Sequence, residues 1–323
     1  MDEFALIDRL FAPLARGAAG AFDLRDDAAT LEVAEGHRLV ATLDQLVAGV
    51  HFLADDDPAL VACKLLRVNL SDLAAMGAVP RAYLLGLAIP RATTEDWLEA
   101  FAGGLADDQA AYGVQLIGGD TVATEGPLVA SLTALGEVRA GVELRRAGAR
   151  PGDAIFVSGT LGDAALGLLA LRGGLAGVDE AGRAALIERY RLPRPRVALG
   201  QRLAGLAHAA CDLSDGLIAD LGHICECSGV AAEVEAARLP LSPAVRAALA
   251  SDPAMLNTVL AGGDDYELVF TAEPDAATAL SELAAEIDVG IAVIGRIIAG
   301  AGVRVLDERG AALDLPESGY RHM

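Results

Sequence analysis

The chain has 323 residues, a hydrophobic content of 53% and a formal net charge of −21, from 25 Lys+Arg against 46 Asp+Glu. Its length favours two domains, and its apolar content allows a sizeable core. The negative charge argues against nucleic acid as a partner, because phosphate backbones need a basic surface. No apolar run reaches membrane length. The start, Met1-Asp2-Glu3-Phe4, lacks a signal-peptide basic region, so we expect a cytoplasmic protein.

The first half of the chain alternates helical and strand patterns. Pro58 suits the first turn of a helix, Pro90 stops an apolar strand, and Thr94 with Glu95 and Asp96 marks a helix start. In chain order we expect a helix over 2–16, strand 39–47, helix 58–76, strand 83–89, helix 94–113, a short strand 114–117 that ends in Gly118-Gly119-Asp120, and strand 128–138.

Residues 139–153 are rich in Gly, Arg and Pro, and we place a domain boundary here, with domains 1–140 and 141–323. In the second half we expect strand 155–158, helix 162–172, helix 195–208, helix 216–227, strand 230–235, helix 243–250, strand 266–271, helix 275–286, and strands 290–298 and 303–307. Alternating strands and helices in both halves predict an α/β or α+β fold with two α/β domains, the second with a mixed sheet and flanking helices.

Aspartates follow or interrupt apolar runs throughout the chain. They are Asp26-Asp27, Asp44, Asp72, Asp120, Asp212, Asp215 and Asp264-Asp265. A buried lone carboxylate is costly, and this chain has few cations to meet it. Hard oxygen ligands of this kind suit Mg²⁺ with a phosphate co-ligand. A triphosphate near several carboxylates is repelled unless metal ions lie between them. These residues therefore indicate an enzyme that uses Mg²⁺ and a nucleotide.

Each motif also has a structural interpretation. Asp72 lies on one apolar face of the expected helix 58–76, where it can ligate a metal or pair with Arg67. Gly118-Gly119-Asp120 can approach a phosphate or form an ordinary turn. Asp212 and Asp215 can hold a metal or cap a helix. His51, after a strand end, is structural or part of a ligand-facing loop.

Two pairs of motifs suggest an internal repeat. Asn69-Leu-Ser-Asp72 precedes Gly118-Gly-Asp120, and Asp212-Leu-Ser-Asp215 precedes Gly262-Gly-Asp264 at about the same separation. Chance is an alternative explanation for motifs this short. The phosphate-loop, protein-kinase and dinucleotide-binding motifs are missing from the sequence.

The combined motifs resemble the thiamine-monophosphate kinase family. The matching segments are Asp26-Asp27-Ala-Ala, Asp44-x-Leu-Val-Ala-Gly-Val-His51-Phe52, Lys64-x-x-x-Val-Asn-Leu-Ser-Asp72-Leu-Ala-Ala-Met-Gly-Ala, Gly118-Gly-Asp120-Thr121, Arg146-x-Gly-Ala-x-Pro-Gly-Asp153, Asp212-Leu-Ser-Asp215-Gly-Leu, Gly262-Gly-Asp-Asp-Tyr-Glu-Leu268 and the ending Gly319-Tyr320-Arg-His322-Met. The wider superfamily includes aminoimidazole ribonucleotide synthetase and selenophosphate synthetase.

This resemblance implies ATP-dependent phosphorylation of thiamine monophosphate to thiamine diphosphate with Mg²⁺, by a homodimer whose N-terminal domains pair through their sheets. It implies that Asp72, Asp120, Arg146 and Asp212 are catalytic and that Gly119, Asp120, Arg146 and Ser214 contact ATP. Implied substrate residues are His51, Asp264 and Tyr320. Implied metal ligands are Asp27, Thr42, Asp44, Asp72, Asp120, Asp212 and Asp215.

The sequence departs from this family at three positions. Asp23-Leu24-Arg25 stands where Gly-x-Gly usually precedes the Asp pair, Leu43 stands where Ser or Thr is usual, and Asp264 replaces Glu. Two alternatives therefore stay open: another ATP-using member of the superfamily, such as a selenophosphate synthetase, and a non-catalytic protein that binds Mg-nucleotide.

Overall fold

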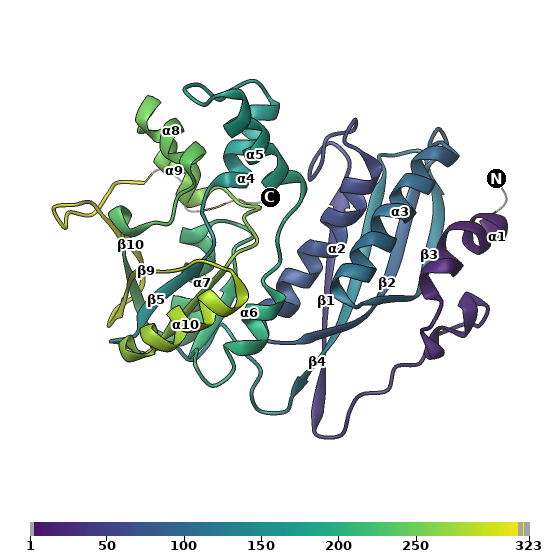
Figure 1. The fold of residues 1–323 in the computed structure, drawn as a ribbon, viewed down its shortest axis with the longest axis horizontal. Coiled ribbons are helices and arrows are strands. Elements are labelled where there is room, and N and C mark those ends of the chain that lie inside the picture. The colour runs from purple at the N-terminus through teal and green to yellow at the C-terminus, as the bar shows by residue number, and fades with distance from the viewer. Residues whose placement is uncertain (1–2, 316–318, 320–323) are drawn as a thin grey trace. The chain divides into compact units, whose positions relative to one another are not determined.

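The computed structural model describes residues 3–315 and 319 (Figure 1). Its backbone divides into two compact units, an N-terminal unit of Met1–Leu73 with Ala78–Gly141 and a C-terminal unit of Ala74–Gly77 with Val142–Met323. Both units combine a sheet with helices, so the predicted two-part α/β fold is confirmed. The roles that the sequence assigned to residues 1–140 and 141–323 stay predictions. Tyr320 lies outside the described residues.

The N-terminal unit contains a four-stranded sheet with one face covered by two helices (Figure 1). Its strands, in the order β1-β4-β2-β3, are His37–Val47, Val129–Arg139, Val79–Pro90 and Gln115–Thr124. The β2 and β3 strands are parallel, and the other neighbours are antiparallel. The helices are α2 (Pro58–Ala75) and α3 (Glu95–Tyr112). Because successive residues of a strand face opposite sides, each strand has one side toward α2 and α3 and one opposite side, which we call the open side. The N-terminal segment covers part of this open side, where Ala15 and Ala21 pack with Ala82 and Ile117.

Helix α3 shows how the sequence sets its own ends. The Thr94 hydroxyl accepts a hydrogen bond from the Trp97 amide at 3.2 Å, which satisfies a donor in the first turn. Glu95 and Asp96 lie where the helix dipole favours negative charge. Gly113 ends the helix with a φ of 66°, in the left-handed region that glycine adopts without a steric penalty. The predicted limits of this helix are confirmed.

The N-terminal segment is more irregular than its amphipathic pattern predicts. The single helix expected over 2–16 is instead a short α-helix α1 (Glu3–Leu6), a π-helix η1 (Ile7–Phe11) and a 3₁₀-helix η2 (Ala12–Ala15). Pro13 has no amide hydrogen to continue the α-helical pattern, which accounts for the change at η2. A further 3₁₀ segment, η3 (Ala19–Leu24), leads toward Asp26.

Strand β3 continues well beyond its predicted end. It was expected to stop at Ile117, but Gly118-Gly119-Asp120 lie within the strand and pair with β2. The absence of side chains makes this pairing possible, because a Cβ atom on Gly119 would lie 2.0 Å from the Leu85 carbonyl oxygen. Gly119 therefore serves close strand packing, and the interpretation of this motif as an ordinary turn is wrong.

The C-terminal unit contains a six-stranded mixed sheet in the order β10-β7-β9-β5-β8-β6. In that order the strands are Gly302–Leu306, Ala231–Glu235, Ile291–Ile298, Ala154–Ser158, Leu268–Ala272 and Ala209–Asp212. Only the β10–β7 pair is parallel among these strands of the described chain. Phe156 on β5 and Phe270 on β8 stack at the core with ring centroids 5.3 Å apart.

Helices flank this sheet and match the predictions unevenly. They are α4 (Asp163–Leu171), α5 (Glu180–Arg191), α6 (Val197–Arg202), α7 (Leu217–Ser228), α8 (Pro243–Ser251), α9 (Met255–Ala261) and α10 (Ala277–Ile287), with 3₁₀ turns η4 (Ala236–Arg238) and η5 (Pro274–Ala276). The sequence did not predict α5 or α9, and the helix expected over 195–208 ends at Arg202. None of the helices built from described residues has both the length and the apolar character needed to span a bilayer.

Two adjacent glycines of α3 give a matched test of the packing between α2 and α3 in the N-terminal unit. A Cβ atom on Gly104 would lie 2.3 Å from the Ala59 carbonyl oxygen on α2, whereas one on Gly103 meets nothing within 4 Å. We expect Gly104→Ala to lower the free energy of unfolding by about 1–3 kcal/mol through overpacking. Gly103→Ala should raise it by about 0.5–1 kcal/mol through helix propensity. Urea unfolding of both variants measures this, and equal effects would contradict the described α2–α3 contact.

Candidate functional site

One group of predicted ligands lies on the helix-covered side of the N-terminal sheet. The Thr42 hydroxyl on β1 donates a hydrogen bond to the Asp72 carboxylate on α2. The Asp44 amide donates to the Asn69 side-chain oxygen at 3.1 Å. The structure therefore brings Thr42, Asp44 and Asp72 together between β1 and α2. These side chains offer the hard oxygen donors that suit Mg²⁺.

The structural alternative for Asp72 was an ion pair with Arg67. Arg67 forms a bidentate pair with Asp108 of α3, with both N–O distances at 2.8 Å. Asp108 is only 2% exposed, so this pair neutralises a deeply buried charge and joins α2 to α3. Arg67 thus has a structural function of its own between α2 and α3.

A second group lies on the open side of the same sheet. Asp26, Asp27 and Asp120 line a cavity of about 710 Å³, together with Gly118 and Gly119. Strand register places Asp120 beside Gly86, and Gly86 beside Ser131 of β4, which also line this cavity. Asp120 is thus on the opposite side of the sheet from Asp44 and Asp72. The predicted metal ligands of this unit form two separate groups.

A third group surrounds the end of β6 in the C-terminal unit. Asp212 is 3% exposed at the strand end. The Arg146 guanidinium lies near the Cys211 side chain and the Asp212 and Asp220 carboxylates. A guanidinium beside a strand-end carboxylate offers a bidentate grip on phosphate. The structure thus brings the predicted residues Arg146 and Asp212 together.

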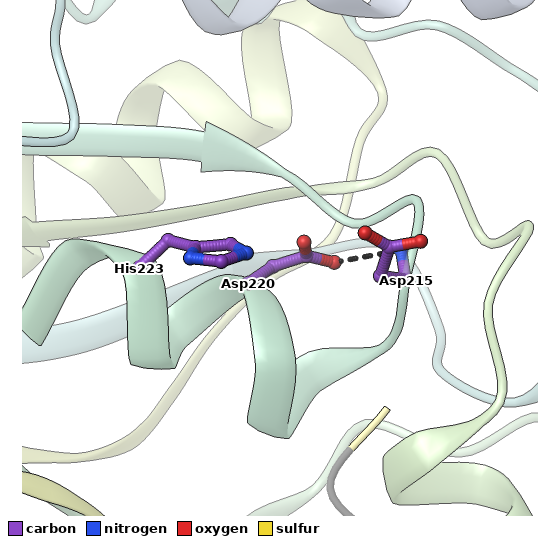
Figure 2. Close-up of side chains that lie close together, drawn as sticks. All are labelled: Asp215, Asp220 and His223. Atoms are coloured by element: carbon purple, nitrogen blue, oxygen red, sulfur yellow. Dashed lines mark hydrogen bonds between the residues drawn. The ribbon is translucent and has the colours of Figure 1, made fainter. Parts of the chain in front are cut away.

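Asp215 lies beside two residues that sequence reasoning missed (Figure 2). Ligand atoms of Asp215, Asp220 and His223 lie within 4.8 Å of one another. The Asp220 carboxylate accepts hydrogen bonds from the Asp215 and Gly216 amides at 3.0 and 3.1 Å, which fixes the turn before α7. Burial, followed by the nearby Asp215 charge, raises the pKa of Asp220 to about 7. The spacing of Asp220 and His223, one helical turn apart, was the signal in the sequence.

The Gly262-Gly263-Asp264 segment pairs with the Asp212–Asp215 segment. The Asp264 amide donates to the Ser214 carbonyl at 2.9 Å, and the Tyr266 amide donates to the Leu213 carbonyl at 2.8 Å. A Cβ atom on Gly263 would lie 2.1 Å from the Ser214 carbonyl oxygen, so glycine is needed for this approach. The structure therefore holds the predicted residues Ser214, Asp215 and Asp264 on two paired segments.

His51 lies in the turn after β1. Its Nδ1 atom accepts a hydrogen bond from the Val47 amide at 3.1 Å, and its carbonyl accepts one from the Lys64 ammonium at 3.1 Å. The ring orientation is thus set by the backbone of its own turn. These bonds support the structural interpretation, and the predicted substrate contact stays a prediction.

The suggested internal repeat has no counterpart in secondary structure. Residues 69–72 lie within helix α2, whereas residues 212–215 lie at the end of β6 and in the following turn. Residues 118–120 lie in a strand, whereas residues 262–264 lie outside any helix or strand. These differences argue against an internal repeat and favour chance as the origin of the similarity.

Comparison with known proteins identifies the family. The family model for the AIR synthase related protein, N-terminal domain, matches residues 25–138, and the family model for its C-terminal domain matches residues 150–308. The chain is 47% identical over 304 residues to the thiamine-monophosphate kinase of Caulobacter vibrioides, covering 93% of this chain and 85% of the relative. It is 43% identical to the Escherichia coli K12 enzyme of that name, covering 99% and 98%. The chain belongs to the thiamine-monophosphate kinase family.

Solved structures of this family share the fold. The crystal structure of thiamine-monophosphate kinase from Stenotrophomonas maltophilia K279a matches with a TM-score of 0.85 and 46% identity, covering 97% of this chain and 98% of that one. A structure of AaThiL complexed with AMPPCP and TMP matches with a TM-score of 0.79 and 32% identity, covering 99% and 97%. The hydrogenase maturation protein HypE, at 21% identity and a TM-score of 0.77, shares the fold.

Asp265, next to Asp264, gives a pH-dependent test of the C-terminal site. It is 3% exposed and accepts hydrogen bonds from the Gly162 and Ala164 amides at 2.7 and 3.4 Å. Burial raises its pKa from 3.8 to about 8. Between these values the unfolded chain has lost the proton that the folded chain keeps, so this residue makes stability fall as pH rises.

We expect Asp265→Asn to remove this contribution, because asparagine does not ionise. The melting temperature of the variant relative to the unchanged protein should therefore rise between pH 5 and pH 8. Asp275→Asn, at an exposed acid of η5, is the control. Thermal unfolding at both pH values is the measurement, and a constant difference for Asp265→Asn would show that the carboxyl is already ionised in the folded protein.

Proposed function

We propose that this protein transfers the γ-phosphoryl group of ATP to thiamine monophosphate, giving thiamine diphosphate and ADP. Identity of 47% to a curated thiamine-monophosphate kinase, over 93% of the chain, carries this proposal. The carboxylates expected from the family motifs are present, and the structure gathers them into local groups. A cytoplasmic location, where ATP is available, stays a prediction.

The acceptor in this reaction is itself a phosphate anion, so no strong general base is required. The protein has to position two anions and neutralise their charge during in-line transfer. We assign Asp27, Thr42, Asp44, Asp72, Asp120, Asp212 and Asp215 to Mg²⁺ binding. Their hard oxygen donors fit that ion, which when bound would neutralise phosphate charge. The two sides of the N-terminal sheet imply at least two distinct ions.

We assign the remaining predicted residues to the two substrates. Gly119, Asp120, Arg146 and Ser214 contact ATP. Arg146 supports this role best, because its guanidinium carries positive charge beside Asp212, where phosphate would otherwise be repelled. His51, Asp264 and Tyr320 contact the thiamine substrate.

The direct test is product formation. Purified protein is incubated with Mg-ATP and thiamine monophosphate, and the thiamine phosphates are separated by chromatography. We expect thiamine diphosphate together with an equal amount of ADP. ATP binding without a diphosphate product would contradict the proposal. It would favour another acceptor, as in a selenophosphate synthetase-like enzyme, or a non-catalytic nucleotide-binding protein.

Asp72→Asn tests the metal-ligand assignment. Asparagine keeps the shape of the side chain and can still accept the Thr42 hydrogen bond, so the fold should persist. Loss of the negative charge should reduce kcat by about 100-fold or more. Asp107→Asn, at an exposed acid of α3, is the control and should leave kcat unchanged. Unchanged kcat of Asp72→Asn at saturating Mg²⁺ would remove Asp72 from the catalytic set.

We also propose that two copies of the chain pair through the open side of the N-terminal sheet. Leu43, Leu84 and Val122 lie on this side and are 57%, 36% and 49% exposed. Large apolar residues on one sheet face are typical of a protein–protein contact. A second copy presents the same apolar face, as a two-fold interface requires.

Leu43→Asp should disrupt this dimer, since it places a charge in the apolar contact. Val50→Asp, at a residue 52% exposed in the turn after β1, is the matched control. Sedimentation velocity should show a monomer for the first variant and a dimer for the control. A dimer that survives Leu43→Asp would place the interface elsewhere.

A further inference from the structure

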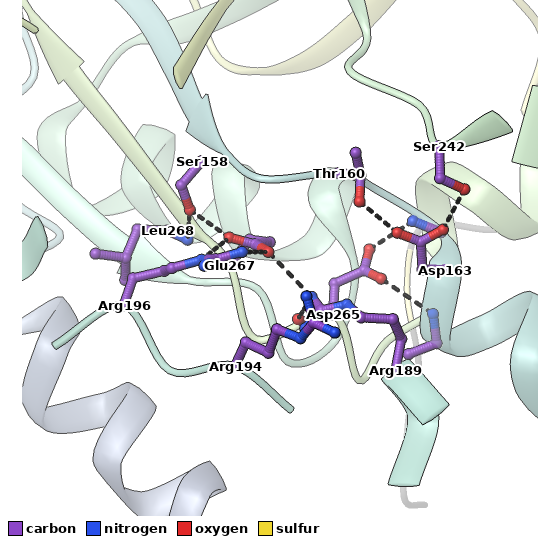
Figure 3. A network of polar contacts seen from close by, with 12 residues as sticks. Ser158, Thr160, Asp163, Arg189, Arg194, Arg196, Ser242, Asp265, Glu267 and Leu268 are labelled. Atoms are coloured by element: carbon purple, nitrogen blue, oxygen red, sulfur yellow. Dashed lines mark hydrogen bonds and ion pairs between the residues drawn. The ribbon is translucent and has the colours of Figure 1, made fainter. Parts of the chain in front are cut away.

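A buried polar cluster centred on Glu267 lies directly before strand β8 (Figure 3). Glu267 is fully buried, and its carboxylate accepts hydrogen bonds from Arg189 at 3.0 Å, from Arg196 at 2.5 Å and from the Ser158 hydroxyl at 2.6 Å. Arg189 lies on α5 and Arg196 directly precedes α6. We call Ser158, Arg189, Arg196 and Glu267 the Glu267 cluster.

The Glu267 cluster is expensive to bury. Removing a carboxylate and guanidinium groups from water costs several kcal/mol per ion, which their mutual attraction offsets only with good geometry. The side chains of Arg189 and Arg196 are 10% and 16% exposed, and that of Glu267 is 0% exposed. An apolar residue at position 267 would pack before β8 without this cost. The cluster therefore needs a reason beyond stability.

The cluster also fixes the backbone on both sides of Glu267. Arg189 donates a second hydrogen bond to the Asp265 carbonyl at 3.2 Å. The Ser158 hydroxyl oxygen accepts one from the Leu268 amide at 2.9 Å. Glu267 contributes its own carbonyl, which accepts from the Leu213 amide at 2.8 Å. The backbone over 265–268 is thus held by side chains from α5 and β5.

The backbone of segment 264–267 has an unusual conformation next to the acidic residues Asp264 and Asp265. Asp264 and Tyr266 have φ values of 70° and 49°, in the left-handed region that non-glycine residues rarely adopt. Such residues cost about 1–3 kcal/mol each and persist only when their surroundings determine them. The amides of these same two residues bind the carbonyls of Ser214 and Leu213.

We propose that Arg189, Arg196 and Glu267 are positioning residues for phosphoryl transfer. They hold segment 264–267 in its left-handed conformation against residues 213–214. This pairing keeps the Asp264 side chain in register with Asp212 and Asp215. The reaction named here rests on the proposed function, whereas the mechanical coupling of the two segments does not.

Hydrogen exchange measures that coupling without any substrate. Arg189→Lys and Arg196→Lys keep the positive charge but lose the guanidinium geometry. In Arg189 one nitrogen bridges Glu267 and the Asp265 carbonyl, and in Arg196 two nitrogens bind Glu267. Arg202→Lys is the control, because Arg202 forms a bidentate pair with Glu286 at the surface of the same unit. We expect the amides of Leu213, Asp264 and Tyr266 to exchange at least about tenfold faster in the first two variants. The control should leave them unchanged.

Unchanged exchange at these three amides in folded Arg189→Lys and Arg196→Lys would overturn the proposal. If either variant fails to fold, Ser158→Ala takes its place, since it removes one hydrogen bond to Glu267 and keeps both ion pairs. The same amides should then exchange faster, and protection equal to that of the unchanged protein would again contradict the proposal.

Steady-state kinetics separates positioning from stability. At a temperature where the variants are fully folded, we expect kcat to fall at least about tenfold, since small displacements of reacting groups have large effects. The KM for ATP should change by less than about threefold. A folded variant with faster exchange and unchanged kcat would contradict the positioning role. If the unchanged protein forms no thiamine diphosphate, the proposed function fails, and the exchange result still decides the coupling.

Discussion

The structure depends on how an acidic chain accommodates carboxylates with few cations to meet them. Asp108 and Glu267 are buried with arginine partners, which is the expensive solution that joins helices and fixes backbone. Asp265 follows a second route, since burial raises its pKa to about 8 and it is largely protonated at neutral pH. Asp26, Asp27 and Asp120 follow a third, because they line a cavity whose described lining residues include no arginine or lysine. We assign Asp27 and Asp120 of this third kind to metal ions, together with Asp44, Asp72, Asp212 and Asp215.

Two of the departures from the family pattern lie close to the predicted metal-binding carboxylates. Asp23 stands at the first glycine position of the usual Gly-x-Gly, and its φ of 55° remains in the region that glycine favours, at a steric cost. Arg25, at the second glycine position, has a φ of −114°, which any residue adopts. Leu43 points to the open side of the sheet, away from the Thr42–Asp72 hydrogen bond. The missing hydroxyl at position 43 therefore leaves that ligand pair intact.

Sequence patterns predicted elements with strong local signals and missed those set by tertiary contacts. Caps and periodicity determine α3 and α2, whose limits were predicted to within a residue. The Gly118-Gly119 pair fits an ordinary turn by sequence, but Gly119 allows the close approach of β2, a tertiary contact that no local pattern shows. For the site, residue chemistry predicts that Asp72 and Asp120 bind a metal, which stays a prediction, but which side of the sheet each occupies depends on strand register. Glu267 was noticed only as part of a motif, since its partners on α5 and before α6 are distant in sequence.

The proposed mechanism requires that the carboxylate groups accept a nucleotide only through metal ions. Thermal unfolding with the non-hydrolysable ATP analogue AMPPCP tests this, in Mg²⁺ and in EDTA at matched ionic strength. Ligand that binds the folded state raises the melting temperature. We expect a clear rise in melting temperature with the analogue and Mg²⁺ together, and none with the analogue in EDTA, because the triphosphate is then repelled. An equal rise in EDTA would contradict it and assign nucleotide binding to arginine and backbone groups alone.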